Sequence, residues 1–139
     1  MKYRPIFSSI LFLSVISIAF AKHQQPAGYV VQQEKNIQRS ESGPHDGGGS
    51  TIAAPFFENI PDFKFAFRKR TLHSGSTIGY HLQKVDEVYY ILSGSGEMTM
   101  NGNKFTVAVG DAILTRGGSS HGLKPIGEKD LALLIVYQK

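Results

Sequence analysis

Apolar and polar residues alternate with a period of two through much of the chain from residue 52 onward. In residues 63–68, three phenylalanines alternate with lysine, alanine and arginine, which is the pattern of a strand with one buried face. No segment of useful length beyond residue 21 shows the period of an amphipathic helix. The further stretches that we predict as strands, each bounded by turn residues, are 77–81, 87–92, 97–100, 105–109, 112–114 and 131–137. Many short strands at close spacing indicate an all-β sandwich or barrel.

The strongest turn signal lies at Asn101-Gly102, between two of the predicted strands. Both central residues of a type I′ turn need a positive φ angle, which asparagine and glycine tolerate best. We therefore predict a β-hairpin with a two-residue loop at this position.

Residues 22–51 differ in composition from the rest, and we expect a loop-rich, flexible N-terminal extension before a barrel domain at 52–139. Residues 29–31 are apolar and could pair as a short strand, whereas residues 40–50 read SESGPHDGGGS and are typical of a linker. His45 and Asp46 lie in this linker. We expect both in a solvated loop, and the alternative is that they contact a metal ion.

Residues 1–21 have the layout of a secretory signal peptide. Lys2 and Arg4 precede an apolar run at residues 6–20, and Ala19-Phe20-Ala21 has the small-x-small pattern of a cleavage site. The alternative is a retained membrane anchor, but the run is shorter than the roughly 20 residues that span a bilayer. We therefore predict cleavage after Ala21 and a secreted or periplasmic protein with no stable membrane insertion.

Composition and charge exclude some kinds of metal site and argue against nucleic-acid binding. The chain has no cysteine, so disulfide frameworks and thiolate zinc sites are excluded, while imidazole and carboxylate metal sites remain open. The formal net charge is +4, and removal of Lys2 and Arg4 with the leader lowers it to +2. This excess is too small, and too little clustered, to predict nucleic-acid binding.

One group of polar residues carries candidate metal chemistry. Side chains at i and i+2 of a strand point to the same side, so His81 and Gln83 share a face, and Glu87 has the same parity. Only the predicted hairpin at 97–109 separates this group from His121, which can fold back beside it. Two imidazoles, one carboxylate and one amide oxygen would then converge inside a barrel.

The spacing of these residues resembles the two motifs of the cupin family. The family's first motif reads Gly-x5-His-x-His-x3 or 4-Glu-x6-Gly, and its second reads Gly-x5-Pro-x-Gly-x2-His-x3-Asn. The matching residues are Gly75, His81, Glu87, Gly94, Gly110, Gly118 and His121. The resemblance implies a double-stranded β-helix of jelly-roll type, with a metal site and a small-molecule pocket inside the barrel.

The chain departs from these motifs at three positions. Gln83 stands at the usual second histidine, Arg116 at the usual proline and Pro125 at the usual asparagine. Only Gln83 concerns the metal, because an amide oxygen is a harder and weaker ligand than an imidazole. Gln83 either binds as a fourth ligand or leaves that position to water.

The predicted metal ligands are therefore His81, Glu87 and His121, with Gln83 as the fourth. Two histidines and a carboxylate suit non-haem iron and catalytic zinc, and manganese and nickel remain open. The alternative is that the two histidines only pack inside the barrel.

Residues near the site have more than one interpretation. Tyr89 shares the parity of Glu87 and is a candidate acid or hydrogen-bond donor beside Glu87, or else a packing residue. Arg68 and Arg70 alternate with the phenylalanines and are candidates to grip a substrate carboxylate or phosphate. The alternative for these arginines is a solvated strand face.

The resemblance implies an exported metal-binding cupin that acts on a small polar molecule, sugar-like or organic-acid-like, by isomerase or dioxygenase chemistry. Glu87 and a bound water would share the proton transfer, which makes Glu87 a candidate catalytic residue as well as a metal ligand. The first alternative is a non-catalytic cupin that binds a small molecule such as a carbohydrate. The second is a structural protein whose barrel serves homodimer contacts through its sheets, with residues 29–31 as an edge. Export disfavours phosphorylated intracellular metabolites as substrates.

Overall fold

The structure is a computed structural model in which residues 28–139 are described. A single 3-10 turn, η1 (Glu34–Asn36), precedes ten strands. They are β1 (Arg39–Ser42), β2 (Ser50–Phe56), β3 (Phe65–Leu72), β4 (Ile78–Leu82), β5 (Glu87–Ser93), β6 (Ser95–Met100), β7 (Asn103–Ala108), β8 (Ala112–Thr115), β9 (Ser120–Pro125) and β10 (Leu131–Gln138). Within the described residues, no helix has the length and hydropathy to cross a membrane. The predicted leader, residues 1–21, lies outside the described part, so cleavage after Ala21 stays a prediction.

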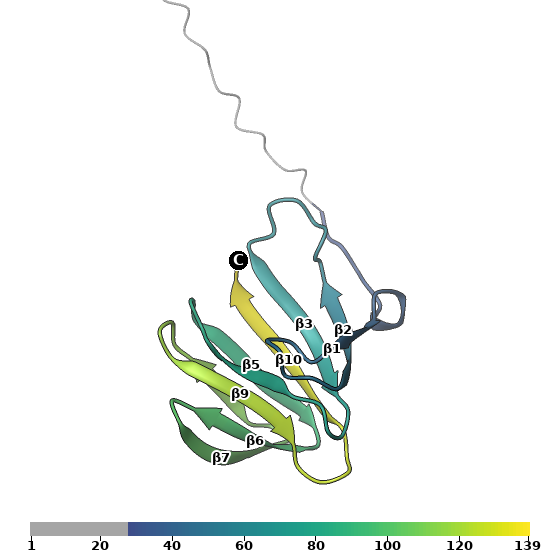
Figure 1. Ribbon diagram of the computed structural model, residues 1–139. Coiled ribbons are helices and arrows are strands. Elements are labelled where there is room, and N and C mark those ends of the chain that lie inside the picture. The colour runs from purple at the N-terminus through teal and green to yellow at the C-terminus, as the bar shows by residue number, and fades with distance from the viewer. Residues whose placement is uncertain (1–27) are drawn as a thin grey trace, which may run out of the picture. The chain divides into compact units, whose positions relative to one another are not determined.

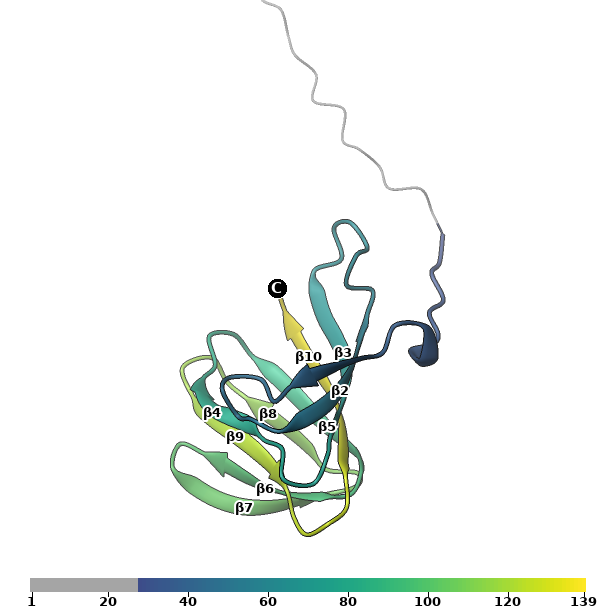
Figure 2. The same cartoon turned by 45° about the vertical axis from the view of Figure 1, so that its right-hand side comes forward.

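The strands form two antiparallel sheets that face each other (Figures 1 and 2). The larger sheet has the order β1-β2-β3-β10-β5-β8 and the smaller has the order β4-β9-β6-β7. Beyond β3 the chain passes repeatedly from one sheet to the other, and only the β6–β7 hairpin stays within one sheet. This arrangement confirms the predicted all-β, jelly-roll barrel.

The inner faces of the two sheets make one apolar core. The larger sheet contributes residues such as Leu72, Ile91 and Leu133, and the smaller contributes Met98 and Leu123, all with at most 1% of their surface exposed. Burial of each such side chain contributes about 1.5–3 kcal/mol to folding. Without disulfides, this core is the main source of the stability of the barrel.

Two sequence predictions on the strands hold in detail. In β5, Glu87, Tyr89 and Ile91 are buried, whereas Val88, Tyr90 and Leu92 are exposed. The hairpin at Asn101-Gly102 joins β6 to β7 with φ angles of 48° and 81° at its two central residues. Both angles are positive, as the type I′ prediction requires.

The prediction for β3 was wrong in its phase. The strand exists, but its inner face carries Ala66, Arg70 and Leu72, and Phe65 is 49% exposed. The phenylalanines instead pack on one another on the other side, where the Phe56, Phe63, Phe65 and Phe67 rings take part in a chain of aromatic contacts. The sequence identified the alternation correctly but assigned the buried face to the wrong residues. Arg70 can be buried because its hydrogen-bond partners, Glu41 and Thr51, lie on other strands.

The segment before residue 52 contributes more regular structure than its composition suggests. β1 and β2 pair with each other, and β2 pairs with β3 along six residues, so the predicted boundary at residue 52 falls within β2. β2 buries the small side chains of Thr51, Ala53 and Ala54, which give only a weak hydrophobic signal. Residues 29–31, by contrast, form no strand. The predicted homodimer stays a prediction.

Candidate metal centre

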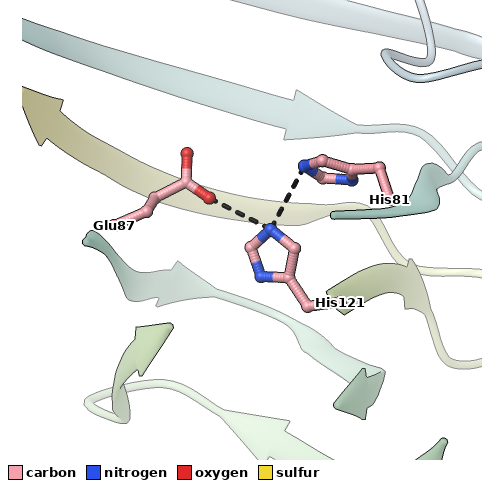
Figure 3. Close-up of side chains that lie close together, drawn as sticks. All are labelled: His81, Glu87 and His121. Atoms are coloured by element: carbon pink, nitrogen blue, oxygen red, sulfur yellow. Dashed lines mark hydrogen bonds and ion pairs between the residues drawn. The ribbon is translucent and has the colours of Figure 1, made fainter. Parts of the chain in front are cut away.

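Three polar side chains from three strands meet inside the barrel (Figure 3). His81 lies on β4 and His121 on β9, and the two residues face each other in the antiparallel register of these strands. Glu87 is the first residue of β5 in the opposite sheet. The pairing of β4 with β9 shifts register between Ile78 and His81, and such irregularities re-aim side chains locally.

The ligand atoms of these residues lie close enough to share one ion. His121 Nε2 lies 3.1 Å from Glu87 Oε2 and 3.3 Å from His81 Nε2 (Figure 3). One ligand atom from each of the three residues lies within 4.8 Å of the other two. Donor atoms held about 2.1 Å from one ion lie roughly 3.0–3.4 Å apart at octahedral or tetrahedral angles. The two measured separations fit this range.

Neighbouring oxygens orient both imidazoles. His81 Nδ1 lies 2.8 Å from the carbonyl oxygen of Gly79, which can only accept, so Nδ1 of His81 carries the proton. His121 Nδ1 lies 2.8 Å from the hydroxyl oxygen of Thr115 in a buried contact, and this oxygen can accept the Nδ1 proton. Both Nε2 atoms then direct lone pairs toward each other and toward Glu87.

The burial of this cluster favours a bound cation. His121 is fully buried and Glu87 is 5% exposed, and Oε2 of Glu87 has no hydrogen-bond partner among the described residues. Three acceptors that face one another in a largely buried site are unfavourable unless a proton or a positive ion lies between them. A divalent metal ion would satisfy all three acceptors, so His81, Glu87 and His121 fit a metal site.

Tyr89 lies beside this cluster, two residues along β5 from Glu87. Its ring stacks on that of His121 with a centroid separation of 5.1 Å. Burial raises the pKa of Tyr89 well above its usual value, and the charge and hydrogen bond of the Glu87 carboxylate raise it further. The phenol therefore stays protonated and serves as a hydrogen-bond donor.

A hollow of about 340 Å³ opens beside the candidate metal ligands. Its lining includes His81 and Glu87 together with Gln83, so the amide predicted as the fourth ligand borders the same space. Lys84 and Lys139 also line it and give it a positive lining. The site can thus hold a metal ion at its wall and admit a small anionic molecule next to it.

His45 is exposed and lies in a turn, as the sequence predicted, but it also borders this hollow, which the sequence did not predict. Its ring stacks on that of His81, with the centroids 3.4 Å apart and the planes 7° from parallel. Burial lowers the pKa of His45, and the nearby His81 lowers it further. The sequence around His45 gives no sign of this contact. His45 and His81 meet because the turn at residues 43–49 forms backbone hydrogen bonds with residues 77–79.

The two arginine candidates are placed differently. Arg70 is 2% exposed, and its guanidinium donates to Glu41 at 2.7 Å and to Thr51 at 2.6 Å, which ties it into an internal ion pair. This burial corrects the expectation of a solvated face at Arg70. Arg68 lines a neighbouring hollow of about 160 Å³, which shares Tyr137 and Lys139 with the metal pocket. Its buried Nε has no partner among the described residues, and substrate binding by Arg68 stays a prediction.

The motif departure at Arg116 has a structural explanation. Arg116 Nε lies 2.9–3.0 Å from the carboxylate of Asp86, which also accepts a hydrogen bond from the backbone of Gly117. Backbone and side-chain hydrogen bonds from Gly117 and Arg116 hold the pKa of Asp86 below its usual value. This contact joins the turn before Glu87 to the turn before His121 without a proline.

Comparisons with known proteins agree with this geometry. A family model described as "Cupin domain" matches residues 69–137. An oxalate-binding protein of Thermotoga maritima is 37% identical over 71 residues, which make up 50% of this chain and 59% of that protein. An uncharacterized protein of Methanocaldococcus jannaschii is 41% identical over 49 residues, 35% of this chain and 39% of that protein. The match therefore spans less than two thirds of either curated relative.

A solved structure matches over more of the chain. It is described as a "predicted oxalate decarboxylase" from Thermotoga maritima, and it superposes with a TM-score of 0.70 at 30% sequence identity. The superposition covers 77% of this chain and 96% of the other. The match extends well beyond the motif residues.

Proposed function

This chain belongs to the cupin family, and on that premise we propose that it is an exported protein that binds a small organic acid at a divalent metal ion. His81, Glu87 and His121 would hold the metal, which is iron, manganese, nickel or zinc. The observation that carries the proposal is the buried convergence of three acceptor atoms at the wall of an open hollow. When bound, such a metal supplies Lewis-acid attraction for carboxylate oxygens.

The lining of the hollow favours an anionic ligand over a neutral sugar. Lys84 and Lys139 contribute two positive charges, and the amide of Gln83 can donate hydrogen bonds to a carboxylate. The relatives named as oxalate-binding and as a predicted oxalate decarboxylase make oxalate the first ligand to test. Export, which is supported by the pattern of residues 1–21, would expose the pocket to free rather than phosphorylated acids.

Catalysis of isomerase or dioxygenase type is the second candidate, and Tyr89 is the observation that favours it. Its protonated phenol shares a hydrogen bond with Glu87 and stacks on His121, so a proton donor lies directly beside the metal ligands. A fixed hydrogen-bond donor of this kind can stabilise negative charge that develops in a transition state. Incubation of the metal-loaded protein with oxalate and with sugar acids, followed by NMR, separates a binder, which leaves the ligand intact, from an enzyme.

Metal content tests the ligand assignment directly. We expect the purified wild-type protein to contain about one equivalent of a divalent metal by elemental mass spectrometry, and His121→Ala to contain almost none. His73→Ala is the matched control, because His73 is a half-exposed histidine that pairs with Asp130 outside the site. Oxalate titration of the wild-type protein should give heat that is absent for His121→Ala. Equal metal content in wild type and His121→Ala would refute the assignment.

A further inference from the structure

The turn at residues 43–49, between β1 and β2, brings His45 into the metal pocket. The His45 ring covers one face of the His81 ring in a parallel stack. It also borders the hollow that is lined by Gln83 and Glu87. Neither ring nitrogen of His45 has a hydrogen-bond partner within residues 28–139, so both are available to a bound molecule.

The backbone of this turn is built to hold His45 in that position. His45 and Asp46 have φ angles of 55° and 58°, in the left-handed region that residues other than glycine rarely adopt. Such angles persist only where the surroundings impose them, and they are concentrated at functional sites.

The backbone contacts that hold this turn come from Thr77 and Gly79, at the start of β4, the strand that carries His81. The carbonyl oxygen of Pro44 accepts a hydrogen bond from Gly79 N at 2.9 Å, and Gly48 O accepts one from Thr77 N at 3.3 Å. A Cβ atom at Gly79 would collide with the carbonyl oxygen of His45, so this close approach requires glycine. The turn and the ligand-bearing strand are therefore one joined unit.

His45 is also separate from the motif that defines the family. The family model matches residues 69–137, whereas His45 lies upstream of it. The metal ligands His81, Glu87 and His121 form a cluster within 4.8 Å that does not include His45. The imidazole is thus placed next to the metal ligands as part of the pocket wall.

We propose that His45 is a ligand-recognition residue, whose imidazole N–H donates a hydrogen bond to a carboxylate oxygen of the acid held at the metal centre. This inference rests on the proposed function. It assigns selectivity for the bound acid to a residue outside the family's metal-binding motif. If His45 instead only packs on His81, its loss will change metal binding rather than acid binding.

The test compares wild type, His45→Phe, His45→Asn and Asp46→Asn after reconstitution with Mn²⁺. Phenylalanine keeps a ring to stack on His81 but has no N–H, whereas asparagine keeps a donor and tolerates the left-handed backbone. Asp46→Asn is the matched control in the same turn, because Asp46 is exposed and has a similar φ angle. Metal content, melting temperature and oxalate titration are measured for each.

We expect His45→Phe to retain about one equivalent of Mn²⁺ and to bind oxalate about tenfold more weakly, as the loss of a charge-assisted hydrogen bond predicts. His45→Asn should recover part of the affinity, and Asp46→Asn should match the wild type. Wild-type oxalate affinity in His45→Phe, or loss of Mn²⁺ from it, would overturn this inference alone. Failure of the metal-loaded wild type to bind oxalate would overturn the proposed function, and this inference with it.

Discussion

At the scale of single residues, the chemistry of the site depends on which nitrogen of each histidine is engaged elsewhere. Gly79 and Thr115 occupy the Nδ1 atoms of His81 and His121, which leaves both Nε2 atoms for a metal. Such outer contacts set the tautomer and the ring orientation of metal-binding histidines. Thr115 is buried, so the contact with His121 is protected from competing water.

Gln83 is the residue whose chemistry departs most from the family motif, and it allows a gain-of-binding test. Gln83→His would add a third imidazole to the two of the candidate metal site, and imidazole is a stronger ligand than an amide for these metals. We expect this variant to bind Zn²⁺ or Mn²⁺ at least tenfold more tightly in a chelator-competition titration. Weaker binding would mean that the hollow does not accept an imidazole at position 83.

At the scale of elements, a buried ion pair fastens the N-terminal strands to the barrel. Arg70 on β3 donates to Glu41 on β1 and to Thr51 on β2, so one guanidinium connects three adjacent strands. Burial raises the pKa of Glu41, but the hydrogen bonds from Arg70 and Arg39 outweigh it and leave the pKa below the usual value of 4.5. The turn that carries His45 follows β1 directly.

Glu41→Gln should destabilise the barrel by about 2–3 kcal/mol near neutral pH, because it leaves Arg70 buried without its counter-charge. A carboxylate whose folded pKa is lowered stabilises the protein above its unfolded pKa, and this stabilisation disappears as the pH falls through the folded pKa. Urea unfolding at pH 6 and near pH 3 should therefore show a smaller acid loss for Glu41→Gln than for wild type. Glu128→Gln, at an exposed position, serves as the control. Identical acid losses in all three proteins would contradict the assigned role.

At the scale of the whole barrel, the candidate metal site connects the two sheets. His81 and His121 belong to the smaller sheet and Glu87 belongs to the larger. A metal bound by all three would therefore join the sheets in a chain that has no disulfide. Folding and metal binding are then linked, because the unfolded chain does not hold the three ligands together.

Removal of the metal should lower the melting temperature. At a free metal concentration one hundred times Kd, binding stabilises the native state by about 2.7 kcal/mol. For a domain of this size, that free energy corresponds to a shift on the order of 10 °C. Calorimetry with and without a chelator should show this shift for wild type and none for His121→Ala. A chelator effect of the same size in His121→Ala would place the stabilising ion elsewhere.

The sequence by itself determined the motif residues and seven of the ten described strands, but not β1, β2 or β9, the strand that carries His121. Alternation identified the faces of β5 and the Asn101-Gly102 signal located the hairpin, because both depend on residues that are neighbours along the chain. The spacing of His81, Glu87 and His121 also predicted that these residues converge. It could do so because the spacing matches the cupin motifs, and the cupin fold brings the residues at these motif positions together.

Only the tertiary structure decided which side of β3 is buried and what reaches the metal pocket. Arg70 can be buried because the Glu41 carboxylate balances its charge and the Thr51 hydroxyl accepts one of its hydrogen bonds. Both partners lie on other strands, and nothing in the sequence of β3 indicates them. His45 reaches His81 because β1 and β2 extend the larger sheet and direct their connecting turn onto β4. Contacts between residues distant in sequence depend on the packing of whole elements, which local hydrophobic patterns do not specify.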